Sequence, residues 1–296
     1  MLNKDKPVEI VIDDQSCINC SYCASICPAD YLISKNNKIY ANENSSFGCI
    51  QCGHCMISCP TNSIKIRGEG ISENDIVHLS EHLPDFDAIN SLFIKRRSIR
   101  KFKNQEIPKE VIDKIIQAAS TAPISIPPSE VKILVINGFD KVQEFAEDLV
   151  KGFVQFQKIF NPLTLKLFKP IIGEVQYKLF KDFILPLAKI TVDARKEGND
   201  ILFYNAPTVV LFYGTELTDK EDQILASAHA AIAAESLGLG TCIIGSVPSL
   251  LEKDKKLKEK YGILKNEKPG VAFVLGYPDI KFKRGIQRRF KAVRYY

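Results

Sequence analysis

The first 67 residues alternate brief apolar runs with longer polar loops. The apolar runs at residues 8–12, 38–41 and 63–67 predict short strands, arranged as a strand-loop-strand pattern that occurs twice. Gly68-Glu69-Gly70 follows the last run, and residues 71–90 are polar and acidic. Such a change of pattern separates compact units, so we predict a small domain over residues 1–67 and a linker over 68–90.

A larger second domain is predicted over residues 91–296. Apolar residues at helical spacing recur there, with β-branched apolar runs between them. The predicted helices cover residues 86–96, a segment that begins at Pro108, residues 140–151 and residues 222–238. The predicted strands cover residues 131–136, 207–213 and 269–276. Helices that alternate with strands predict an α/β or α+β sheet domain.

Residues 152–190 have a pattern of their own. They contain six phenylalanines, lysines interrupt the apolar residues throughout, and prolines 162, 170 and 186 are expected to break any long helix. A membrane span is not expected, because ~18 consecutive uncharged apolar residues are absent. We predict that residues 152–204 form a mobile helical lid over a pocket. Ordinary packing, or a surface between two copies of the chain, explains the pattern equally well.

Composition and charge narrow the class of protein. Hydrophobic residues make up 45% of the chain and charged residues 25%, which is ordinary for a globular protein. The net charge of +5 is mild and its basic residues are scattered, so nucleic-acid binding is not expected. No signal peptide is recognised, and the cysteine usage fits a reducing compartment, so a cytoplasmic protein is expected.

Eight of the nine cysteines lie in two runs of identical spacing, C-x₂-C-x₂-C-x₃-C-P. The first run holds Cys17, Cys20, Cys23 and Cys27, and the second holds Cys49, Cys52, Cys55 and Cys59. This is the spacing of bacterial ferredoxins that bind two [4Fe–4S] clusters. The ninth, Cys242, lies in an apolar run and is expected to be a buried small side chain.

The spacing also predicts which cysteines share a cluster. Three thiolates at three-residue steps bind three irons of one cube, and the fourth, before proline, binds the other cube. The first cluster is therefore expected to take Cys17, Cys20, Cys23 and Cys59, and the second Cys49, Cys52, Cys55 and Cys27. A disulfide scaffold would suit a secreted chain, and zinc sites would want two C-x₂-C pairs with a longer gap.

Residues 1–67 thus resemble two-cluster bacterial ferredoxins. Residues 91–296 contain three further motifs: Arg96-Arg97-Ser98-Ile99-Arg100-Lys101-Phe102, the alanine-rich stretch from Ala228 through Gly238-Leu239-Gly240 to Ile244-Gly245, and Gly276-Tyr277-Pro278 with Arg288 beyond it. With these motifs in this order, residues 91–296 resemble the nitroreductase family of FMN enzymes. The implied fold class is α+β: a ferredoxin-like domain followed by a nitroreductase-like three-layer α/β domain.

The resemblance implies roles for particular residues. Arg96, Arg97, Ser98 and Arg100 would contact the phosphate, ribityl chain or N1–O2 edge of FMN, and Arg288 would complete the phosphate site. The Ile244-Gly245-Ser246 backbone would lie near flavin N5, with Ser125 as a further contact. A solvated basic turn and an ordinary helix end are the alternative interpretations of these segments.

One loop departs from the family pattern. Many members carry A-P-S-x-x-N-x-Q after the second helix, whereas this chain has Pro127 at the asparagine position and Ser129 at the glutamine position. The amide contacts to flavin and substrate are therefore in question, and the departure is consistent with a subgroup that acts on another substrate class.

These features together predict an oxidoreductase that passes electrons from a ferredoxin-type donor through two clusters to FMN. The acceptor would be a small organic molecule such as a nitro compound, quinone or enone, and the resemblance implies a homodimer. The alternatives are flavin-dependent oxidation of a substrate with export of electrons through the clusters, or a non-catalytic electron-transfer or redox-sensing subunit. No side chain stands out as a general acid.

Overall fold

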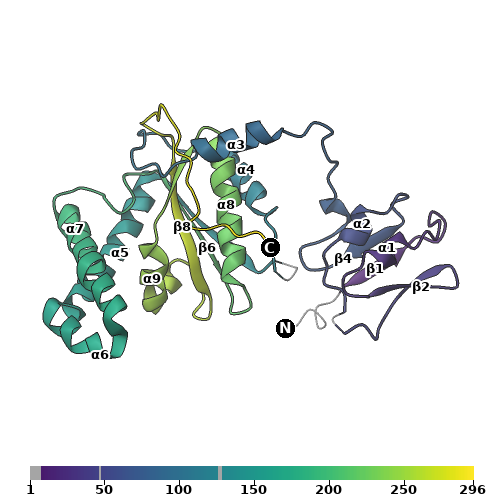
Figure 1. Cartoon of the computed structure of the whole chain (residues 1–296), viewed down its shortest axis with the longest axis horizontal. Helices are drawn as coiled ribbons and strands as arrows, with labels where there is room; N and C mark the ends of the chain where they lie inside the picture. The colour runs from purple at the N-terminus through teal and green to yellow at the C-terminus, as the bar shows by residue number, and fades with distance from the viewer. Residues whose placement is uncertain (1–7, 47, 126–128) are drawn as a thin grey trace. The chain divides into compact units, whose positions relative to one another are not determined.

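The computed structural model describes residues 8–46, 48–125 and 129–296. It divides into two compact units (Figure 1). The first comprises Met1–Leu83 with Ile124–Glu130, and the second comprises Pro84–Pro123 with Val131–Tyr296. The division at Leu83 and Pro84 falls inside the segment predicted as a linker.

The first unit is built from two similar halves. Its strands are β1 (Glu9–Ile12), β2 (Leu32–Lys35), β3 (Lys38–Ala41) and β4 (Ile64–Arg67), and its short helices are α1 (Tyr22–Ser25) and α2 (His54–Ile57). β1 pairs with β4 and β2 pairs with β3, both antiparallel. Strands 8–12, 38–41 and 63–67 were thus predicted nearly to the residue, while β2 was missed because Ser34 and Lys35 weaken its apolar pattern.

The backbone of the two halves repeats with an offset of 32 residues. Left-handed residues occur at Asn19 and Gln51, at Ser21 and Gly53, and at Asp30 and Asn62. In each pair the second residue follows the first by 32 positions, as the second cysteine run follows the first. Five side chains form the buried apolar cluster of this unit: Leu32, Cys55, Met56, Ile64 and Ile66. A core of this size is marginal without a metal centre or another covalent staple.

The second unit contains an antiparallel sheet in the order β5-β6-β8-β7. The strands are β5 (Val131–Asn137), β6 (Thr208–Gly214), β7 (Gly240–Ile243) and β8 (Lys268–Gly276). Its helices are α3 (Phe86–Lys95), α4 (Lys109–Ala119), α5 (Phe139–Ile159), α6 (Pro162–Leu179), α7 (Leu185–Lys196), α8 (Lys220–Ser236), α9 (Ser246–Lys253) and α10 (Lys255–Lys260). Two short segments complete the elements: η2 (Glu73–Asp75), in the first unit, and η3 (Phe180–Ile184), a π-helical turn between α6 and α7.

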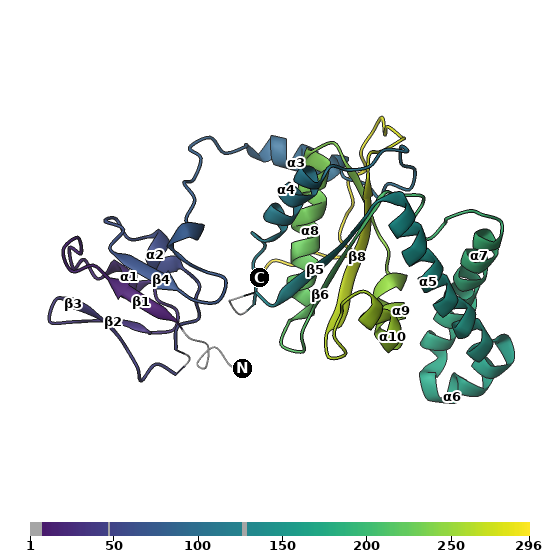
Figure 2. The ribbon, with the colours of Figure 1, turned by 180° about the vertical axis from the view of Figure 1, so that it is seen from behind.

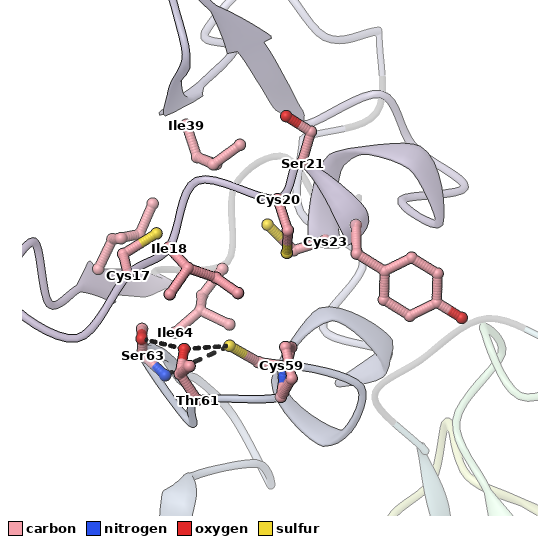
Figure 3. Close-up of a pocket in the computed structure, with 13 residues that line it drawn as sticks. Cys17, Ile18, Cys20, Ser21, Cys23, Ile39, Cys59, Thr61, Ser63 and Ile64 are labelled. Atoms are coloured by element: carbon pink, nitrogen blue, oxygen red, sulfur yellow. Dashed lines mark hydrogen bonds between the residues drawn. The ribbon is translucent and has the colours of Figure 1, made fainter.

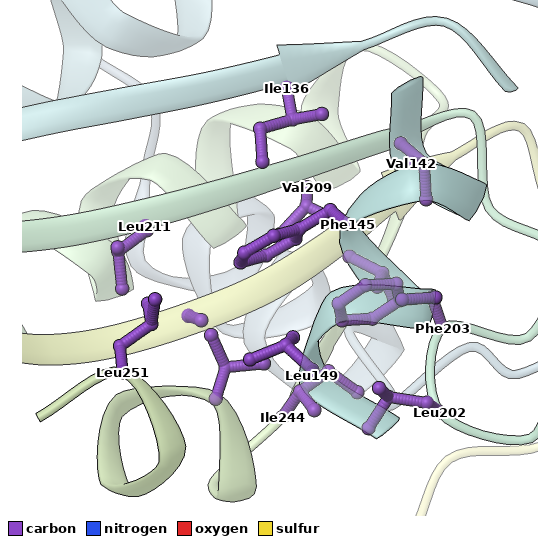
Figure 4. Close-up of a cluster of buried hydrophobic side chains, with 14 of the residues drawn as sticks. Ile136, Val142, Phe145, Leu149, Leu202, Phe203, Val209, Leu211, Ile244 and Leu251 are labelled. Atoms are coloured by element: carbon purple, nitrogen blue, oxygen red, sulfur yellow. The ribbon is translucent and has the colours of Figure 1, made fainter. Parts of the chain in front are cut away.

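Both faces of the sheet are covered by helices, which makes three layers (Figure 2). Side chains of a strand point to opposite faces in turn. Along β6, Val209 and Leu211 pack against α5, α7 and α9, whereas Val210 and Phe212 pack against α4 and α8. The strand is therefore apolar without interruption, which is why the sequence revealed it. Figure 4 shows the apolar cluster between the sheet and α5, around Phe145 and Phe203. The rings of these two residues stack with their centroids 5.6 Å apart.

Helix ends follow recognisable local signals. Pro108 precedes α4, where its missing N–H removes no helical hydrogen bond. Gly238 ends α8 with a left-handed backbone, and the Leu239 N–H donates to the Ala234 carbonyl. β7, α9 and α10 were not predicted, because each is too short for a clear period. Cys242 is buried in the sheet, as predicted.

The segment 152–190 corrects two expectations. α5 continues to Ile159, eight residues beyond the predicted helix, because Phe145, Leu149 and Phe153 extend its buried face. Pro170 does not break α6. The helix kinks at Gly173 instead, where φ is 79° and ψ is 166°, a conformation essentially confined to glycine. Pro162 begins α6 and Pro186 lies in the first turn of α7, positions that tolerate proline. In the described part of the chain, no helix is both long and apolar enough to cross a bilayer.

Candidate functional site

The eight cysteines of the first unit line two cavities. The first cavity, of about 380 Å³ including its open mouth, is lined by Cys17, Cys20, Cys23 and Cys59 (Figure 3). The second, of about 330 Å³, is lined by Cys27, Cys49, Cys52 and Cys55. The structure therefore gathers around each cavity the four cysteines that the spacing assigns to one cluster. The exchange of Cys27 and Cys59 between the halves arises because each proline-flanked cysteine follows its short helix and turns toward the other cavity.

The apolar lining and the thiols of each cavity fit a cluster bound by thiolates. Apart from the cysteines, Ile12, Ile18, Ile39 and Ile64 line the first cavity, and Ile10, Leu32, Ile50 and Ile66 line the second. Within the described ranges, no three His, Cys, Asp or Glu side chains converge as the ligands of a single ion would. The thiols instead stand around spaces that are larger than one ion.

The pKa values of four cysteine thiols are shifted from the ordinary value, three upward and one downward. Burial raises the pKa of Cys23 and of Cys49, and burial with the neighbouring Cys49 sulfur raises the pKa of Cys55 to about 12. Cys59 behaves differently, because hydrogen bonds from Thr61 and Ser63 outweigh its burial and hold its pKa below the ordinary value. Metal ligation requires thiolates, so assembly of a cluster here releases protons and is favoured by rising pH.

Hydrogen bonds reach the cysteine sulfurs unevenly. The Ser63 N–H donates to Cys59 Sγ at 3.3 Å, and the Gln51 N–H donates to Cys49 Sγ at 3.4 Å. The Thr61 hydroxyl lies 3.7 Å from Cys59 Sγ. The Cys17 thiol donates to Asn19 Oδ1 at 3.7 Å, a bond that lasts only while the thiol keeps its proton. Thr61 and Ser63 were not singled out from the sequence, although a comparison of the residues after each C-P pair would have revealed them.

A second site lies at one edge of the sheet in the second unit. The Ile99 N–H donates to the Thr241 carbonyl at 2.9 Å, and Ser98 forms an isolated parallel β-bridge with Thr241. Phe102 bridges Pro278, and the Lys103 N–H donates to the Tyr277 carbonyl at 2.9 Å. The three segments that carry the family resemblance therefore meet along this edge, although more than 100 residues separate the first from the other two.

Glycines make this meeting possible. A Cβ on Gly240 would lie 2.8 Å from Ile99 Cβ and 3.1 Å from Pro278 Cγ. A Cβ on Gly276 would lie 2.7 Å from Phe102 Cδ1. Carbon atoms do not approach so closely, so the motif glycines allow the segments to contact one another.

The predicted FMN-binding residues are distributed unevenly around this edge. Arg96 and Arg97 are half-buried, and Ser98 is exposed next to β7. Arg100 is exposed and its guanidinium lies 5.9 Å from the centre of the Tyr204 ring, a contact not foreseen from the sequence. Ile244 is buried, whereas Gly245 and Ser246 begin α9. Apart from its own chain neighbours, no atom of the described residues lies within 4 Å of the position that a Cβ on Gly245 would occupy.

Two further predicted residues lie elsewhere. Arg288 belongs to the exposed C-terminal segment, which crosses α3 where Gly285 packs against Ile94. Ser125 is exposed and groups with the first unit. Ser129 is exposed too, while the departure at Pro127 lies outside the described residues.

A buried carboxylate shapes the loop that carries Tyr204. Asp200 accepts hydrogen bonds from the N–H groups of Leu202, Phe203 and Asn205, at 2.9 to 3.1 Å. Tyr204 and Asn205 consequently adopt left-handed backbone conformations. The loop leads directly into β6, so Asp200 fixes the ring that contacts Arg100.

Comparison with known proteins identifies both parts. Residues 94–277 match the model of the Nitroreductase family, and residues 16–64 match that of the 4Fe–4S dicluster domain. A curated protein of Methanothermobacter thermautotrophicus, provisionally named an NADH dehydrogenase/NAD(P)H nitroreductase, is 30% identical over 71 residues. That stretch is 24% of this chain and 37% of the relative, so the match spans little more than a third of the relative's length.

Solved structures show the same fold for the second unit. A nitroreductase with bound FMN from Bacteroides fragilis is 18% identical and superimposes with a TM-score of 0.52, over 70% of this chain and 98% of that one. A nitroreductase with bound FMN from Desulfitobacterium hafniense is 16% identical, with the same TM-score and coverage. At these identities the likeness concerns the fold alone.

Proposed function

The chain belongs to the nitroreductase family, and we propose that it is an iron–sulfur flavoprotein oxidoreductase in which a two-cluster domain supplies electrons to FMN. The observation that carries the proposal is the presence, in one chain, of two four-cysteine cavities and of the sheet edge where the family motifs meet. The two features lie in separate compact units, so the fold of one does not explain the presence of the other.

In the first unit, the chain's own work is to hold two clusters. Cys17, Cys20, Cys23 and Cys59 would bind one, and Cys27, Cys49, Cys52 and Cys55 the other. The apolar side chains between them exclude water from the metal centres, which favours transfer of single electrons over reaction with solvent.

In the second unit, Arg96 and Arg97 would bind the flavin phosphate or the N1–O2 edge, since guanidinium forks match both. Gly245 leaves open space at the start of α9, where a planar ring could approach the backbone. FMN, when bound, accepts electrons singly and delivers them in pairs. Arg288 and Ser125 remain proposed contacts.

The helical segment α6–α7 is the proposed substrate-selecting lid. Phe160 contacts the rings of Phe156, Phe168 and Phe180 at centroid distances of 4.9 to 5.9 Å, so an aromatic cluster joins the segment to the end of α5. Its kink at Gly173 and the π-helical turn η3 lie between its straight parts. We propose a small organic acceptor, of the nitro, quinone or enone class, and a ferredoxin-type donor.

A homodimer is proposed from the apolar surface of the second unit. Large apolar side chains are exposed on α3, on α8 and in the C-terminal segment, where Phe290 and Tyr295 are 87% and 93% exposed. Surfaces of this kind ordinarily contact another chain. Phe290→Asp should shift the protein toward the monomer in sedimentation velocity, whereas Leu264→Asp, an exposed position in the second unit, should not. A wild-type mass of one chain, 33.2 kDa, would contradict the dimer.

Anaerobic purification followed by iron, sulfide and flavin analysis tests the central proposal. We expect about eight irons and one FMN per chain. Arg96→Ala should lower FMN retention while the iron content stays unchanged, because the arginine lies outside the cluster unit. Lys101→Ala is the matched control, since its ammonium pairs with Asp279 at 3.3 Å in the same basic segment.

Direction of electron flow is tested by stopped-flow spectroscopy. Dithionite-reduced protein should be reoxidised by a nitro, quinone or enone acceptor. Rapid bleaching of oxidised flavin by an organic donor would instead favour substrate oxidation with electron export through the clusters. Reactivity with neither class would favour a non-catalytic electron-transfer or sensing subunit.

A further inference from the structure

The two cysteine runs are not followed by equivalent residues. Cys59 is followed by Pro60-Thr61-Asn62-Ser63, and Cys27, 32 positions earlier, by Pro28-Ala29-Asp30-Tyr31. The backbones correspond, because Asp30 and Asn62 are both left-handed and each donates its N–H to the carbonyl of its cysteine, at 3.3 and 3.2 Å. The side chains differ: a hydroxyl stands at position 61, where the other half has the methyl group of Ala29.

Thr61 and Ser63 form a compact hydrogen-bonded group around the Cys59 sulfur (Figure 3). The Thr61 hydroxyl lies 3.7 Å from Cys59 Sγ and 2.6 Å from Ser63 Oγ. The Ser63 N–H donates to the same sulfur at 3.3 Å. Two donors can therefore reach Cys59 Sγ, one from a side chain and one from the backbone.

The position of Ser63 is fixed from the other side. The Asp13 N–H donates to the Ser63 carbonyl at 2.8 Å, and the Asp13 carbonyl accepts from the Cys17 N–H at 2.9 Å. Ser63 is also buried, at 2% exposed. The donors at Cys59 are thus held by the backbone that carries another cysteine of the same cavity.

Hydrogen bonds to cluster sulfurs favour the reduced state. Each one-electron reduction adds one negative charge, which spreads over the sulfurs, and a donor aimed at a sulfur stabilises that charge. Donors of this kind consequently raise the reduction potential, and their loss lowers it.

We propose that Thr61 and Ser63 raise the reduction potential of the cluster held by Cys17, Cys20, Cys23 and Cys59 above that of its neighbour. At equilibrium, the first electron from a low-potential one-electron donor would therefore be held by this cluster and not by its neighbour. No proton need accompany the electron. Thr61 is a positioning residue, since it acts through Cys59. The inference rests on the proposed cluster ligation.

A redox titration of the anaerobically purified full chain, followed by EPR and visible absorption, tests this proposal. Two midpoint potentials are expected in the wild type. Thr61→Val, which keeps the shape and removes the hydroxyl, should lower the higher midpoint and leave the other unchanged. Thr61→Ser, which keeps a hydroxyl, should restore most of the wild-type value.

Two further variants make the result specific. Ser21→Ala removes a hydroxyl from the same cavity that bonds to Ser34 Oγ at 2.7 Å, and not to a sulfur, so it should leave both midpoints in place. Cys17→Ser shows which midpoint belongs to the first cluster. If the cluster keeps the oxygen ligand, its midpoint shifts; if the cluster is lost, only the midpoint of the second cluster remains.

Iron analysis separates the two possible failures. A wild type with fewer than eight irons would remove the proposed ligation itself. With eight irons in the wild type and in the Thr61 variants, an unchanged higher midpoint in Thr61→Val, an equal shift of both midpoints, or a Cys17→Ser assignment of the higher midpoint to the second cluster would each overturn the inference.

Discussion

Single residues decide how closely the parts of the second unit approach. Gly240 and Gly245 lie five positions apart in the same motif, yet their surroundings differ completely. A Cβ on Gly240 would meet Ile99 and Pro278, while one on Gly245 would meet open space. Both glycines have ordinary negative-φ or extended backbones, so packing and not backbone conformation distinguishes them.

Gly240→Ala should therefore destabilise the second unit by about 1–3 kcal/mol, the usual cost of overpacking. Urea unfolding followed by far-UV circular dichroism measures this. Gly245→Ala is the matched control and should leave the stability within about 0.5 kcal/mol. Equal stabilities of the two variants would show that the contact with Ile99 adjusts freely.

Asp148 makes one side of the second unit sensitive to acid. Burial acts to raise its pKa, but bonds from Lys151 at 2.7 Å, Lys260 at 2.5 Å and the Tyr261 hydroxyl at 3.0 Å hold that pKa below its ordinary value. A carboxylate with a lowered pKa stabilises the fold above its unfolded-state pKa, near 4. That contribution disappears as the pH falls through the folded-state pKa.

Asp148→Asn should consequently lower the free energy of unfolding by about 2 kcal/mol at pH 7. The difference from the wild type should stay constant down to about pH 5 and shrink below about pH 4. Urea unfolding of both proteins across this range, followed by tyrosine fluorescence, gives the comparison. A difference that grows with acid would mean that Asp148 has the opposite role.

At the scale of elements, α6 and α7 depend on their own aromatic contacts. Phe160 links α5 to the segment, because its ring meets those of Phe156, Phe168 and Phe180. Ring pairs of this geometry stabilise by about 0.5–1.5 kcal/mol each beyond burial. The segment α6–α7 is thus a helical hairpin whose aromatic contacts are local.

Phe160→Ala should loosen this hairpin without unfolding the sheet. Trypsin should then cleave after lysines 166, 178 and 181 several times faster than in the wild type, with iron content unchanged. Val175→Ala is the control, since Val175 is exposed and has no ring partner. Unchanged cleavage in Phe160→Ala would place the stability of α6 elsewhere.

The paired halves of the first unit give a second test at this scale. Cys17 and Cys59 line one cavity although they lie in different runs, and Cys49 lines the other. Cys59→Ala and the double variant Cys17→Ala, Cys59→Ala should both keep about four irons, since one cluster is lost in each. Cys49→Ala, Cys59→Ala should keep almost none. Loss of almost all iron from Cys17→Ala, Cys59→Ala, together with about four irons kept by Cys49→Ala, Cys59→Ala, would show that the runs do not exchange their fourth ligands.

At the scale of the whole molecule, the two units have separate cores. The apolar cluster of the first unit is small, while the two clusters of the second unit lie on the faces of its own sheet. The first unit therefore depends on its iron–sulfur clusters for stability, whereas the second unit is stabilised by its own apolar core.

Oxidative removal of iron with ferricyanide and a chelator should thus unfold the first unit alone. In hydrogen exchange followed by mass spectrometry, the backbone amides of residues 8–67 should lose their protection, while those of β6, β8 and α8 should keep it. A readdition of iron and sulfide under reducing conditions should restore the lost protection. Parallel loss of protection in both units would indicate a single cooperative core.

Local features of the sequence were sufficient for much of this description. The cysteine spacing predicted the two groups of four cysteines that line the cavities, and continuous apolar runs predicted β6 and β8, because cysteine spacing and two-sided burial appear in adjacent residues. The short elements β2, β7, α9 and α10 escaped, since each spans too few residues for a period and is held by tertiary contacts. The FMN candidates rested on resemblance, and the structure brings Ser98 next to β7 while Arg288 lies in the exposed C-terminal segment.

The sequence by itself determined the grouping of the eight cysteines, the two-part organisation and most strands of the sheet. Only the tertiary structure decided the strand order β5-β6-β8-β7. It also decided that Ile99 meets Thr241 and Phe102 meets Pro278, and that the Thr61 hydroxyl lies beside the Cys59 sulfur. The physical reason is sequence separation. Propensity and period act between near neighbours, whereas these contacts join distant residues whose approach depends on packing, on glycines without a Cβ and on the path of the whole chain.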